Sequence, residues 1–470
     1  MSPVFSSYNI VTAIDRKNTE WTAVLWNPLS GAMDLVDASI AEAVQRRELR
    51  ALSSSQVELL VNRGYIYARK EEETARLSQL FKAYNMAYAE KAMAFVLIPT
   101  YRCNLACPYC FQSADQHAES DIMSEELVDL AFDAMAVLAN EKLWGKGKTL
   151  GLFGGEPLIA ERRQMGIVEY ILRQAKHEGF RHIKIITNGF DIAAYFDMLS
   201  EFEVDTLQLT LDGPRPIHDA RRRTRDGAGS FDRVLSAVKE ALERGFTTHV
   251  RVNLDRRNIS ALPELVRILL NEGIGQHKGS IIAPAIVGDF GKLGTYGDVL
   301  SWSEALEGVF NAFGQLEMAS KVLRLDAWPA LKHIQYALRE RRPYLPSFKH
   351  CDSEHHTYVL DNKGDIYTCP DISGRKEYAV GQFSPEVIRF EAKLAEWRTR
   401  SIFNIPKCSQ CSYALICGGG CGLEALNRHG DLLQPLCPRE EIEKMLQLAF
   451  SYYYEQLLGN PSLLAGNGGL

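Results

Sequence analysis

The sequence has no apolar run that approaches the roughly 18 residues of a membrane-spanning helix, so we expect no membrane association. It also lacks a basic surplus: 53 lysines and arginines stand against 59 aspartates and glutamates, which gives a formal charge of −6. Without that surplus we expect no nucleic-acid partner. The first residues, 1–5, show neither the basic start nor the apolar stretch of a signal peptide. These absences predict a cytoplasmic protein.

The composition is that of an ordinary globular chain, and at 470 residues it predicts about three domains. Its ten cysteines are unevenly placed. Three lie close together, namely Cys103, Cys107 and Cys110, and no other follows until Cys351. The remaining cysteines are Cys369, Cys408, Cys411, Cys417, Cys421 and Cys437. In a reducing compartment such clusters indicate metal ligands or catalytic groups rather than disulfides.

The N-terminal region shows short alternating elements. We expect strands at 22–26, 33–36 and 65–67, a turn at 27–31, and amphipathic helices at 40–49 and 57–61. This order is typical of a small winged-helix module, and a plain β/α appendage fits equally well. Apolar residues at helical spacing then predict a connecting helix around 77–84.

The middle of the chain alternates between dense apolar runs and helical patterns. The runs lie at 95–98, 150–153, 183–186, 207–211, 250–254 and 281–287. Strands buried on both faces and separated by helices predict an α/β fold with a parallel sheet. Six such units form either an open doubly wound sheet or a partial barrel. Both place functional loops at the carboxyl ends of the strands.

The C-terminal third is predicted to differ in character. Residues 351–438 have little periodicity and many cysteines and glycines, so we expect bound metal rather than an apolar core to fold them. A last helix is expected at 440–458, and the glycine-rich tail 459–470 should be loose. The predicted domains are 1–90, 91–300, 301–350 (a helical bridge), 351–440 and 441–470.

The spacing Cys103-x₃-Cys107-x₂-Cys110 directly follows the first dense apolar run. Three thiolates in one loop can hold three irons of a cubane cluster and leave the fourth iron open. A zinc site would need a fourth ligand, and His117 is the candidate nearby. The three-cysteine loop resembles that of the radical S-adenosylmethionine (SAM) superfamily. The resemblance implies a partial (β/α)₆ barrel, a [4Fe-4S] cluster, bound SAM and a 5′-deoxyadenosyl radical.

Further motifs agree with this resemblance. Residues 154–157 read Gly-Gly-Glu-Pro and end the second strand, where the family contacts the methionyl amine; alone they would read as a turn. His218-Asp-Ala-Arg-Arg222 resembles the stretch whose arginine holds the methionyl carboxylate. The neighbouring arginines leave this register uncertain by one, and a solvated basic helix start is the alternative. The resemblance implies SAM-binding roles for Tyr109 (against the adenine), Gly154, Gly155, Glu156, Pro157, Asn188, Asp212, Arg222 and Asn253.

The seven later cysteines follow the pattern C-x₁₂-G-x₄-C, then C-x₂-C-x₅-C-x₃-C, then a last cysteine. This resembles the SPASM extension of radical SAM enzymes. The resemblance implies an outer auxiliary cluster on Cys408, Cys411, Cys417 and Cys437, and an inner one on Cys351, Cys369 and Cys421. Three [4Fe-4S] clusters would result, the inner one lacking a fourth cysteine. Zinc is the alternative, because Cys408-x₂-Cys411 alone reads as half a zinc ribbon.

SPASM enzymes mostly modify peptides or proteins. The leading hypothesis is a peptide maturase that installs a thioether or another side-chain cross-link, with a precursor peptide and an electron donor such as flavodoxin or ferredoxin as partners. The N-terminal module would bind a leader peptide by strand addition. The alternative is a sulfatase-maturase-type enzyme that oxidises Cys or Ser to formylglycine.

Formylglycine-forming enzymes carry an aspartate base directly after the second cysteine of the pattern. Here Pro370 takes that place and Asp371 comes one residue later, which weakens the alternative. Asp371 is therefore either a candidate catalytic base or a turn-initiating residue. A non-catalytic zinc or iron–sulfur scaffold is a third hypothesis. Such a scaffold would not need a three-cysteine loop that leaves the fourth iron without a protein ligand.

Overall fold

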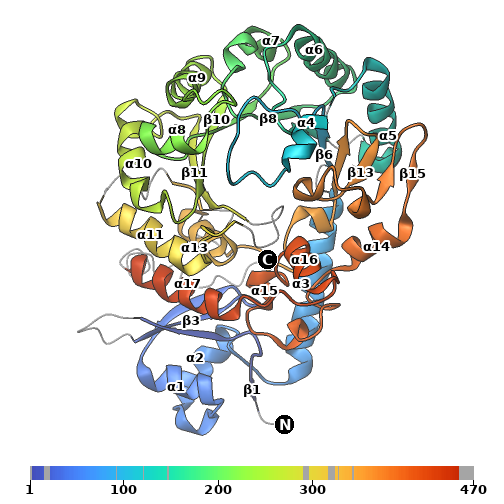
Figure 1. The fold of residues 1–470 in the computed structure, drawn as a ribbon. Coiled ribbons are helices and arrows are strands. Elements are labelled where there is room, and N and C mark those ends of the chain that lie inside the picture. The colour runs from blue at the N-terminus through green and yellow to red at the C-terminus, as the bar shows by residue number, and fades with distance from the viewer. Residues whose placement is uncertain are drawn as a thin grey trace.

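The structure is a computed structural model that describes residues 3–454 except 15–21, 91–92, 120, 145–147, 289–295, 316–322, 326–327 and 341–342 (Figure 1). The predicted tail 459–470 and the end of the predicted last helix lie outside the described residues. Among the helices described, none is long and apolar enough to cross a membrane.

Six parallel strands in chain order curve into a partial barrel (Figure 1). They are β6 (Met93–Ile98), β7 (Lys148–Leu152), β8 (His182–Ile186), β9 (Thr206–Thr210), β10 (Thr247–Leu254) and β11 (Ser280–Ile286). Each coincides with one of the six predicted apolar runs, so the predicted α/β fold is confirmed. Of the two arrangements left open by periodicity, the partial barrel is the one observed.

Helices cover the outer face of this sheet. They are α5 (Glu125–Trp144), α6 (Arg162–His177), α7 (Phe196–Glu201), α8 (Arg215–Arg221), α9 (Phe231–Glu243) and α10 (Leu262–Asn271). The short helix α4 (Ala114–Glu119) lies instead inside the ring of strands in Figure 1. The Ser124 hydroxyl accepts a hydrogen bond from the Leu127 amide and caps α5. Gly245, with φ of +88°, follows the end of α9 in the left-handed conformation that glycine allows.

The cysteine-rich region extends the barrel sheet. Strand β12 (Thr357–Asp361) pairs in parallel with β6, so that Asp361 lies opposite Ile98. It is followed by antiparallel β13 (Asp365–Tyr367), β14 (Gly381–Gln382) and β15 (Ile388–Arg389). All five residues of β12 are buried. The prediction that 351–438 lacks an apolar core is therefore wrong: these strands share the core of the barrel.

Three helices complete this region, namely α14 (Glu391–Thr399), α15 (Ala414–Cys417) and α16 (Gly422–His429). A single turn of 3₁₀ helix at Cys408–Gln410 lies between α14 and α15, and another at Pro370–Ile372 lies between β13 and β14. The first begins at Cys408, and the second begins directly after Cys369.

The N-terminal module has its own small core. It contains β1 (Val4–Phe5), β2 (Ile10–Ala13), β3 (Ala23–Asn27), β4 (Ala32–Val36), α1 (Ala38–Arg46), α2 (Ser54–Asn62) and β5 (Ile66–Tyr67). The sheet order is β2–β3–β4, and β1 pairs with β5. The predicted hairpin, helices and last strand are confirmed, whereas β1 and β2 were not predicted. Helix α3 (Lys70–Glu90), the predicted connector, then leads to β6.

Helices α11 (Trp302–Gln315), α13 (Pro329–Glu340) and α17 (Arg439–Tyr452) lie between the module and the barrel (Figure 1). The Trp26 ring of the module meets the ring of Phe450 edge-on at 6.2 Å and that of His333 at 5.8 Å. The module is thus packed against the rest of the chain through an aromatic contact.

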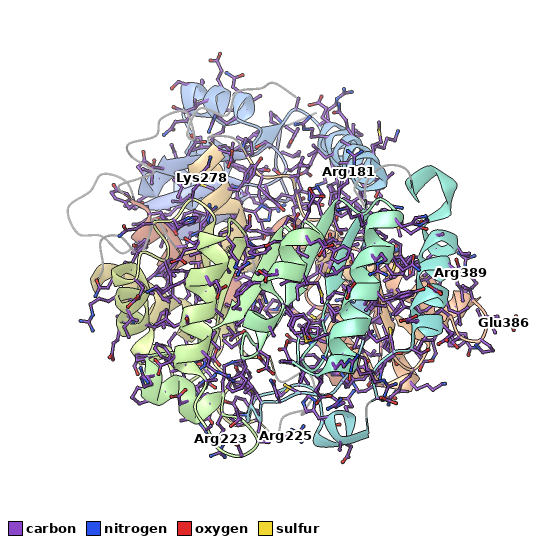
Figure 2. The ribbon with its side chains drawn as sticks, turned by 90° about the horizontal axis from the view of Figure 1, so that it is seen from above. Arg181, Arg223, Arg225, Lys278, Glu386 and Arg389 are labelled. Carbon is purple, nitrogen blue, oxygen red and sulfur yellow. The ribbon has the colours of Figure 1, made fainter. Side chains whose placement is uncertain are left out.

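Labelled basic residues mark the two ends of the barrel in Figure 2. Figure 2 shows Arg181 and Lys278, which precede β8 and β11, at one end. Arg223 and Arg225, which follow α8, lie at the other. The loops at the carboxyl ends of the strands, where the predicted motifs fall, gather at this second end.

Candidate active site

The loop that carries Cys103, Cys107 and Cys110 is held against the segment after α8. The Arg225 Nε donates to the Cys103 carbonyl at 2.9 Å, and the Ala106 amide donates to the Arg223 carbonyl at 2.9 Å. A β-bridge joins Leu105 to Thr224 between them. The cysteine loop is therefore held in place by its pairing with the segment after α8.

The three thiols of this loop lie close together. None of them forms a disulfide, and burial followed by the charges of Glu156 and Cys107 raises the pKa of Cys103 to about 12. Half-buried thiols that lie this close together favour a positively charged ligand that takes up thiolates, and an iron–sulfur cluster is such a ligand. His117 Nε2 lies 3.6 Å from the Cys110 sulfur. Among the residues described, no group of three or more His, Cys, Asp or Glu is arranged around a single metal ion.

The glycines of 154–157 pack against the backbone that leads into the cysteine loop. The Gly155 amide donates to the Thr100 carbonyl at 3.1 Å, and the Glu156 amide donates to the Arg102 carbonyl at 2.7 Å. A Cβ on Gly155 would overlap the carbonyl oxygens of Tyr101 and Arg102. Glycine is needed here because two backbone segments of the protein approach each other closely.

Glu156 has its hydrogen-bond partners within the protein. Its carboxylate accepts from the Thr187 hydroxyl and the Asn188 amide, both at 2.6 Å, and from the Leu158 amide at 2.8 Å. Burial raises the pKa of Glu156 to about 7 despite these donors. The side chain joins the turn after β7 to the turn after β8, and Pro157 continues the first of these turns.

Asn188 lies against the cysteine loop. Its Nδ2 donates to Asn104 Oδ1 at 2.7 Å and lies 3.9 Å from the Cys103 sulfur. Asn104 in turn donates to Asp191 Oδ2 at 2.9 Å. The predicted residue after β8 is thus next to the sulfur site, and Asn104 and Asp191 are partners that the motif did not indicate.

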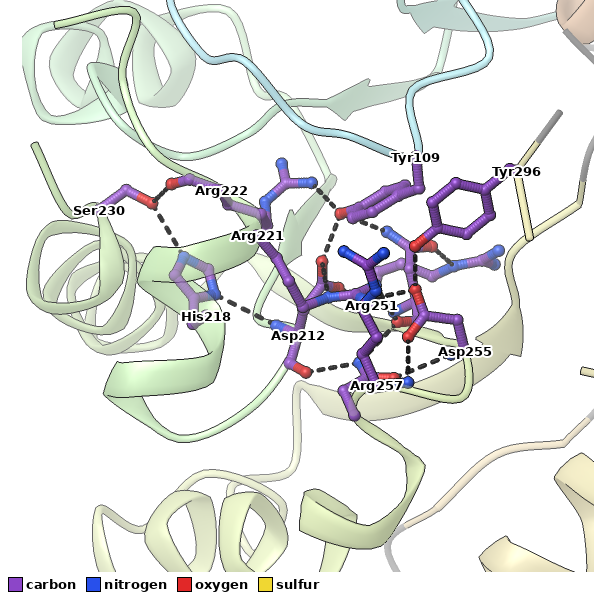
Figure 3. A network of polar contacts seen from close by, with 12 residues as sticks. Tyr109, Asp212, His218, Arg221, Arg222, Ser230, Arg251, Asp255, Arg257 and Tyr296 are labelled. Carbon is purple, nitrogen blue, oxygen red and sulfur yellow. Dashed lines mark hydrogen bonds and ion pairs between the residues drawn. The ribbon is translucent and has the colours of Figure 1, made fainter. Parts of the chain in front are cut away.

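The other predicted SAM-binding residues converge on one hydroxyl (Figure 3). The Tyr109 hydroxyl accepts from Arg222 Nη1 at 2.6 Å and from Asn253 Nδ2 at 3.4 Å, and it donates to Asp212. The Asn253 amide also donates to Asp212 Oδ1 at 2.9 Å. The structure therefore brings Tyr109, Asp212 and Arg222 of three loop segments together with Asn253 of strand β10.

The two adjacent arginines have different surroundings. Arg221 donates to Asp255 and to the Asn253 carbonyl, and its guanidinium covers one face of the Tyr109 ring at 4.7 Å. Arg222 is only 7% exposed, and its Nε has no hydrogen-bond partner among the residues described. The Nε of Arg221 lacks a hydrogen-bond partner as well, but Arg221 forms ion pairs with Asp212 and Asp255, whereas Arg222 has no ion pair among the residues described. Of the two arginines, Arg222, which acts on Cys107, is therefore the better suited to a ligand carboxylate.

His218 holds the backbone on both sides of this network. Burial lowers its pKa to about 3, so the ring is neutral. Its Nδ1 accepts from the Asp212 amide at 3.2 Å, and Nε2 therefore donates to the Ser230 hydroxyl at 2.9 Å, which donates to the Arg222 carbonyl. His218 is a positioning residue for Asp212 and Arg222.

Two residues after β10 were missed by the sequence motifs. Asp255 accepts from Arg221, the Tyr296 hydroxyl and the Arg257 amide (Figure 3). Asn258 donates to the Asp212 carbonyl at 2.6 Å and to the Asn253 carbonyl at 2.8 Å. The signal in the sequence is weak: Asp255 directly follows a buried strand, and Asn258 comes three residues later.

The seven later cysteines fall into two groups. The thiols that raise the pKa of Cys369 are Cys351 and Cys421, after burial and Asp371. The pKa of Cys408 is raised by the neighbouring thiols of Cys411 and Cys437, after burial. The pKa of Cys417 is raised by the thiols of Cys408 and Cys411, again after burial. These are the two sets that the resemblance implied. All seven are free thiols, and Cys351 and Cys437 are exposed.

Asp371 lies between the inner cysteine group and the barrel. Its charge raises the pKa of Cys369. Among the acidic groups around the half-buried Arg251 of β10, Asp371 has the largest effect and raises the pKa of that guanidinium. Burial raises the pKa of Asp371, while Arg251 and Arg375 lower it. The charge of the Asp371 carboxyl therefore acts both on Arg251 of the barrel and on Cys369 of the inner group.

Comparison with known proteins now adds to this geometry. Residues 97–269 match the family model of the Radical SAM superfamily. The chain carries a radical SAM domain. It is similar to pre-heme d1 synthase of Dinoroseobacter shibae, with 26% identity over 71% of this chain and 82% of that protein. It is also similar to PqqA peptide cyclase of Ruegeria pomeroyi, with 30% identity over 37% of this chain and 43% of that protein.

Solved structures share the fold of the radical SAM domain and its extensions. Native anSMEcpe with bound AdoMet aligns over 78% of this chain and 98% of its own, with a TM-score of 0.59 and 17% identity. Streptococcus suis SuiB bound to precursor peptide SuiA aligns over 92% of this chain and 98% of its own, with a TM-score of 0.51 and 15% identity. With a radical SAM domain and relatives named as synthases and cyclases, the protein is an enzyme.

Proposed function

We propose that this enzyme is a peptide maturase that uses SAM and three iron–sulfur clusters to install a thioether or another side-chain cross-link. The observation that carries the proposal is the sorting of ten free cysteines into three groups, one of which lies beside Asp371 and the barrel residue Arg251. SuiB, which has the same fold, is known in complex with a precursor peptide.

The residues of the network would bind SAM through its charged ends. Arg222 would hold the methionyl carboxylate, because its buried guanidinium has no ion pair among the residues described, whereas Arg221 is paired with Asp212 and Asp255. The turn of Gly154, Gly155 and Pro157 would meet the methionyl amine through its backbone. Glu156 would hold that turn in place rather than bind the amine directly, since its oxygens already accept three hydrogen bonds.

Asp212 and Asn253 would orient Tyr109 and Arg222, and Asn188 would fix the cysteine loop. Tyr109 offers adenine only the ring face that Arg221 leaves open. A [4Fe-4S] cluster on Cys103, Cys107 and Cys110 would supply the electron that cleaves SAM and yields the 5′-deoxyadenosyl radical. Flavodoxin or ferredoxin would be the donor, in the cytoplasm.

The later cysteines would hold the auxiliary clusters in the two groups described. Asp371 is the candidate base, because it lies between the inner group and Arg251 and can take a proton from a substrate held there. The N-terminal module would bind the leader of the substrate. Its sheet has outer edges at β2 and β4 with no further strand among the described residues, and an open edge can accept an added strand.

The decisive experiment incubates the reduced, anaerobically prepared enzyme with SAM and a small cysteine-bearing peptide encoded near its gene. Formation of 5′-deoxyadenosine together with a product lighter by one pair of hydrogens supports the proposal. If SAM is cleaved but every such peptide keeps its mass, cross-link formation is ruled out for those peptides. If no 5′-deoxyadenosine forms with or without peptide, the non-catalytic scaffold is favoured.

Oxidation of Cys or Ser to formylglycine is the second candidate. It is favoured by the likeness of the fold to anSMEcpe and by the position of Asp371 beside Cys369. A sulfatase-derived peptide distinguishes the two functions, because only this activity would convert its Cys or Ser to an aldehyde that hydrazine reagents capture.

A further inference from the structure

A cavity of about 800 Å³ lies where the N-terminal module meets the rest of the chain. Its lining comes from the β3–β4 turn, the end of α2, α3, α13 and the segment 343–350. Leu29, Leu80 and Tyr84 are nearly inaccessible and contribute to its wall. A Cβ on Gly31 would lie 2.7 Å from Pro343 Cγ, so the module and the segment 343–350 are packed tightly at this point.

The charges that line this cavity are all of one sign and belong to Arg63, Arg76, Lys332 and Lys349. Burial lowers the pKa of His350, in the same wall, to about 4, so this ring adds no charge. No Asp or Glu lines the cavity, although the whole chain is acidic. Arg63 is paired with Asp34 at 2.8 Å. Arg76 and Lys332 have no ion-pair partner among the residues described; the nearest polar contact of Arg76 is Gln79 at 3.5 Å.

The cavity is also rich in tyrosine and carries exposed apolar side chains on its rim. Tyr84 and Tyr88 have ring centroids 4.5 Å apart, and Tyr336 and Tyr344 have theirs 5.1 Å apart. Val61, Tyr344 and Leu345 are 40%, 37% and 47% exposed and line the same cavity. Large apolar side chains that gather on a surface in this way mark an interaction site.

We infer that this cavity binds an acidic peptide segment with apolar side chains, and that the segment belongs to the substrate. The inference deepens the peptide-maturase function and rests on it. Arg76 and Lys332, which have no ion pair among the residues described, complement glutamate or aspartate, and the tyrosines and the apolar rim accept leucine- or phenylalanine-like side chains.

The position of the cavity supports this assignment. One wall, 343–350, continues directly into Cys351 of the inner cysteine group, and the opposite wall belongs to the module. A peptide held here would therefore be tethered next to the inner group, with its remaining length free to enter the barrel. A nucleic acid is disfavoured because the basic groups form no extended stripe and the rim is apolar.

Binding is tested on the full-length protein with two short fluorescein-labelled peptides. Both carry the same leucines and phenylalanines, with glutamate at the intervening positions of one and lysine in the other. Fluorescence anisotropy should show binding of the glutamate peptide and at least about tenfold weaker binding of the lysine peptide. Equal affinity for both would overturn the inference, and so would displacement of the glutamate peptide by oligo-dT.

Paired variants locate the site. Arg76→Glu should weaken binding of the glutamate peptide about fivefold or more. Arg69→Glu, directly before the same helix but outside the cavity, should change the affinity for this peptide less than about twofold. Leu345→Asp should weaken binding of this peptide, and the exposed Met86→Asp should not. A glutamate peptide with benzoylphenylalanine should photo-cross-link to 61–67, 76–88 or 343–350. Cross-links confined to other segments contradict the assignment.

These measurements need neither SAM nor reduced clusters, so they can succeed if the proposed reaction fails. Conversely, a peptide that is modified without binding here would contradict only the cavity assignment.

Discussion

The Tyr109 hydroxyl lies 2.6 Å from Arg222 Nη1 and also donates a hydrogen bond to Asp212, so that one phenol joins the cysteine loop to two others. The bond keeps the guanidinium of Arg222 beside Cys107, with its Nε left over for a ligand. Under the proposed function, the orientation of Arg222 toward SAM depends on the Tyr109 hydroxyl group.

Arg222→Lys should therefore weaken SAM binding about tenfold to hundredfold, the effect of losing charged hydrogen bonds in a buried site. Tyr109→Phe should weaken it less, by about fivefold, because Arg222 remains but is less well oriented. Equilibrium dialysis with the cluster-loaded protein measures both. Arg223→Lys, at the exposed neighbouring position, is the control; a loss of affinity there equal to that of Arg222→Lys would contradict the assignment.

Gly155→Ala tests the contact between the turn after β7 and the cysteine loop. Its Cβ would overlap two carbonyl oxygens of residues 101–102, so the loop must move. We expect the variant to lose about four irons per chain, the content of one cubane, and with them SAM cleavage.

Gly166→Ala in α6 is the matched control, because a Cβ there meets nothing within 4 Å. It should keep its iron and gain about 0.5–1 kcal/mol of stability from the better helix propensity of alanine. Full iron in Gly155→Ala would show that the close packing of the two segments is not needed for cluster assembly.

The two later cysteine groups predict separable losses of metal. Anaerobically prepared wild-type protein should hold about twelve irons and negligible zinc, and the Cys103/Cys107/Cys110→Ala variant about eight. Cys369/Cys421→Ala and Cys408/Cys411→Ala should each also retain about eight irons, since each pair belongs to a different group. About four irons with one or two zincs in the wild type would mean that the later cysteines bind zinc instead.

The barrel could be predicted from sequence because buried parallel strands appear as dense apolar runs, and all six runs became strands. The pairing of β12 with β6 could not, since Ala94 and Thr357 are brought together only by the tertiary fold. Strand β2 was not predicted because it has only four residues and no turn signal beside it, too short a stretch to show a clear alternation of apolar and polar residues.

Those residues of the candidate site that belong to a sequence motif could be predicted, whereas their partners outside the motifs could not. Cysteine spacing indicated the metal ligands, but it did not reveal that Asn188 and Asn104 brace the cysteine loop. The arginine run left two registers open, and only the partners of Arg221 and Arg222 distinguish them. The glycines of 154–155 were expected to admit a ligand, whereas their immediate neighbours are backbone carbonyls of the chain itself.

Asp371→Asn separates SAM cleavage from the later proton transfer. Because Asp371 lies with the inner group and Arg251 rather than in the Tyr109 network, the variant should still form 5′-deoxyadenosine with the peptide present. Product should fall about hundredfold or more, the usual contribution of a general base. Glu386→Gln, at a labelled exposed position in Figure 2, should leave product formation unchanged. Full product formation by Asp371→Asn would assign the residue a structural role.

Asp361 predicts a pH dependence of stability. Its buried carboxylate accepts from the amides of Lys363 and Asp365 and from the Tyr101 hydroxyl, yet burial raises its pKa to about 6. The folded protein then binds more protons than the unfolded chain between pH 3.8 and about 6. The contribution of this group to the free energy of unfolding is therefore greatest below that range and is lost as the pH rises through it, by about 3 kcal/mol at most.

Asp361→Asn should remove this dependence, because the amide keeps one accepting oxygen for both backbone donors and can donate to Tyr101. Thermal unfolding of the wild-type protein should then shift to higher temperature on acidification from about pH 7 to about pH 5, with a smaller shift in the variant. At neutral pH the variant should be the more stable of the two. Asp133→Asn, an exposed carboxyl on α5, should behave as the wild type. A variant that is less stable than wild type at pH 7 would mean that the ionised carboxylate is favoured by its three donors.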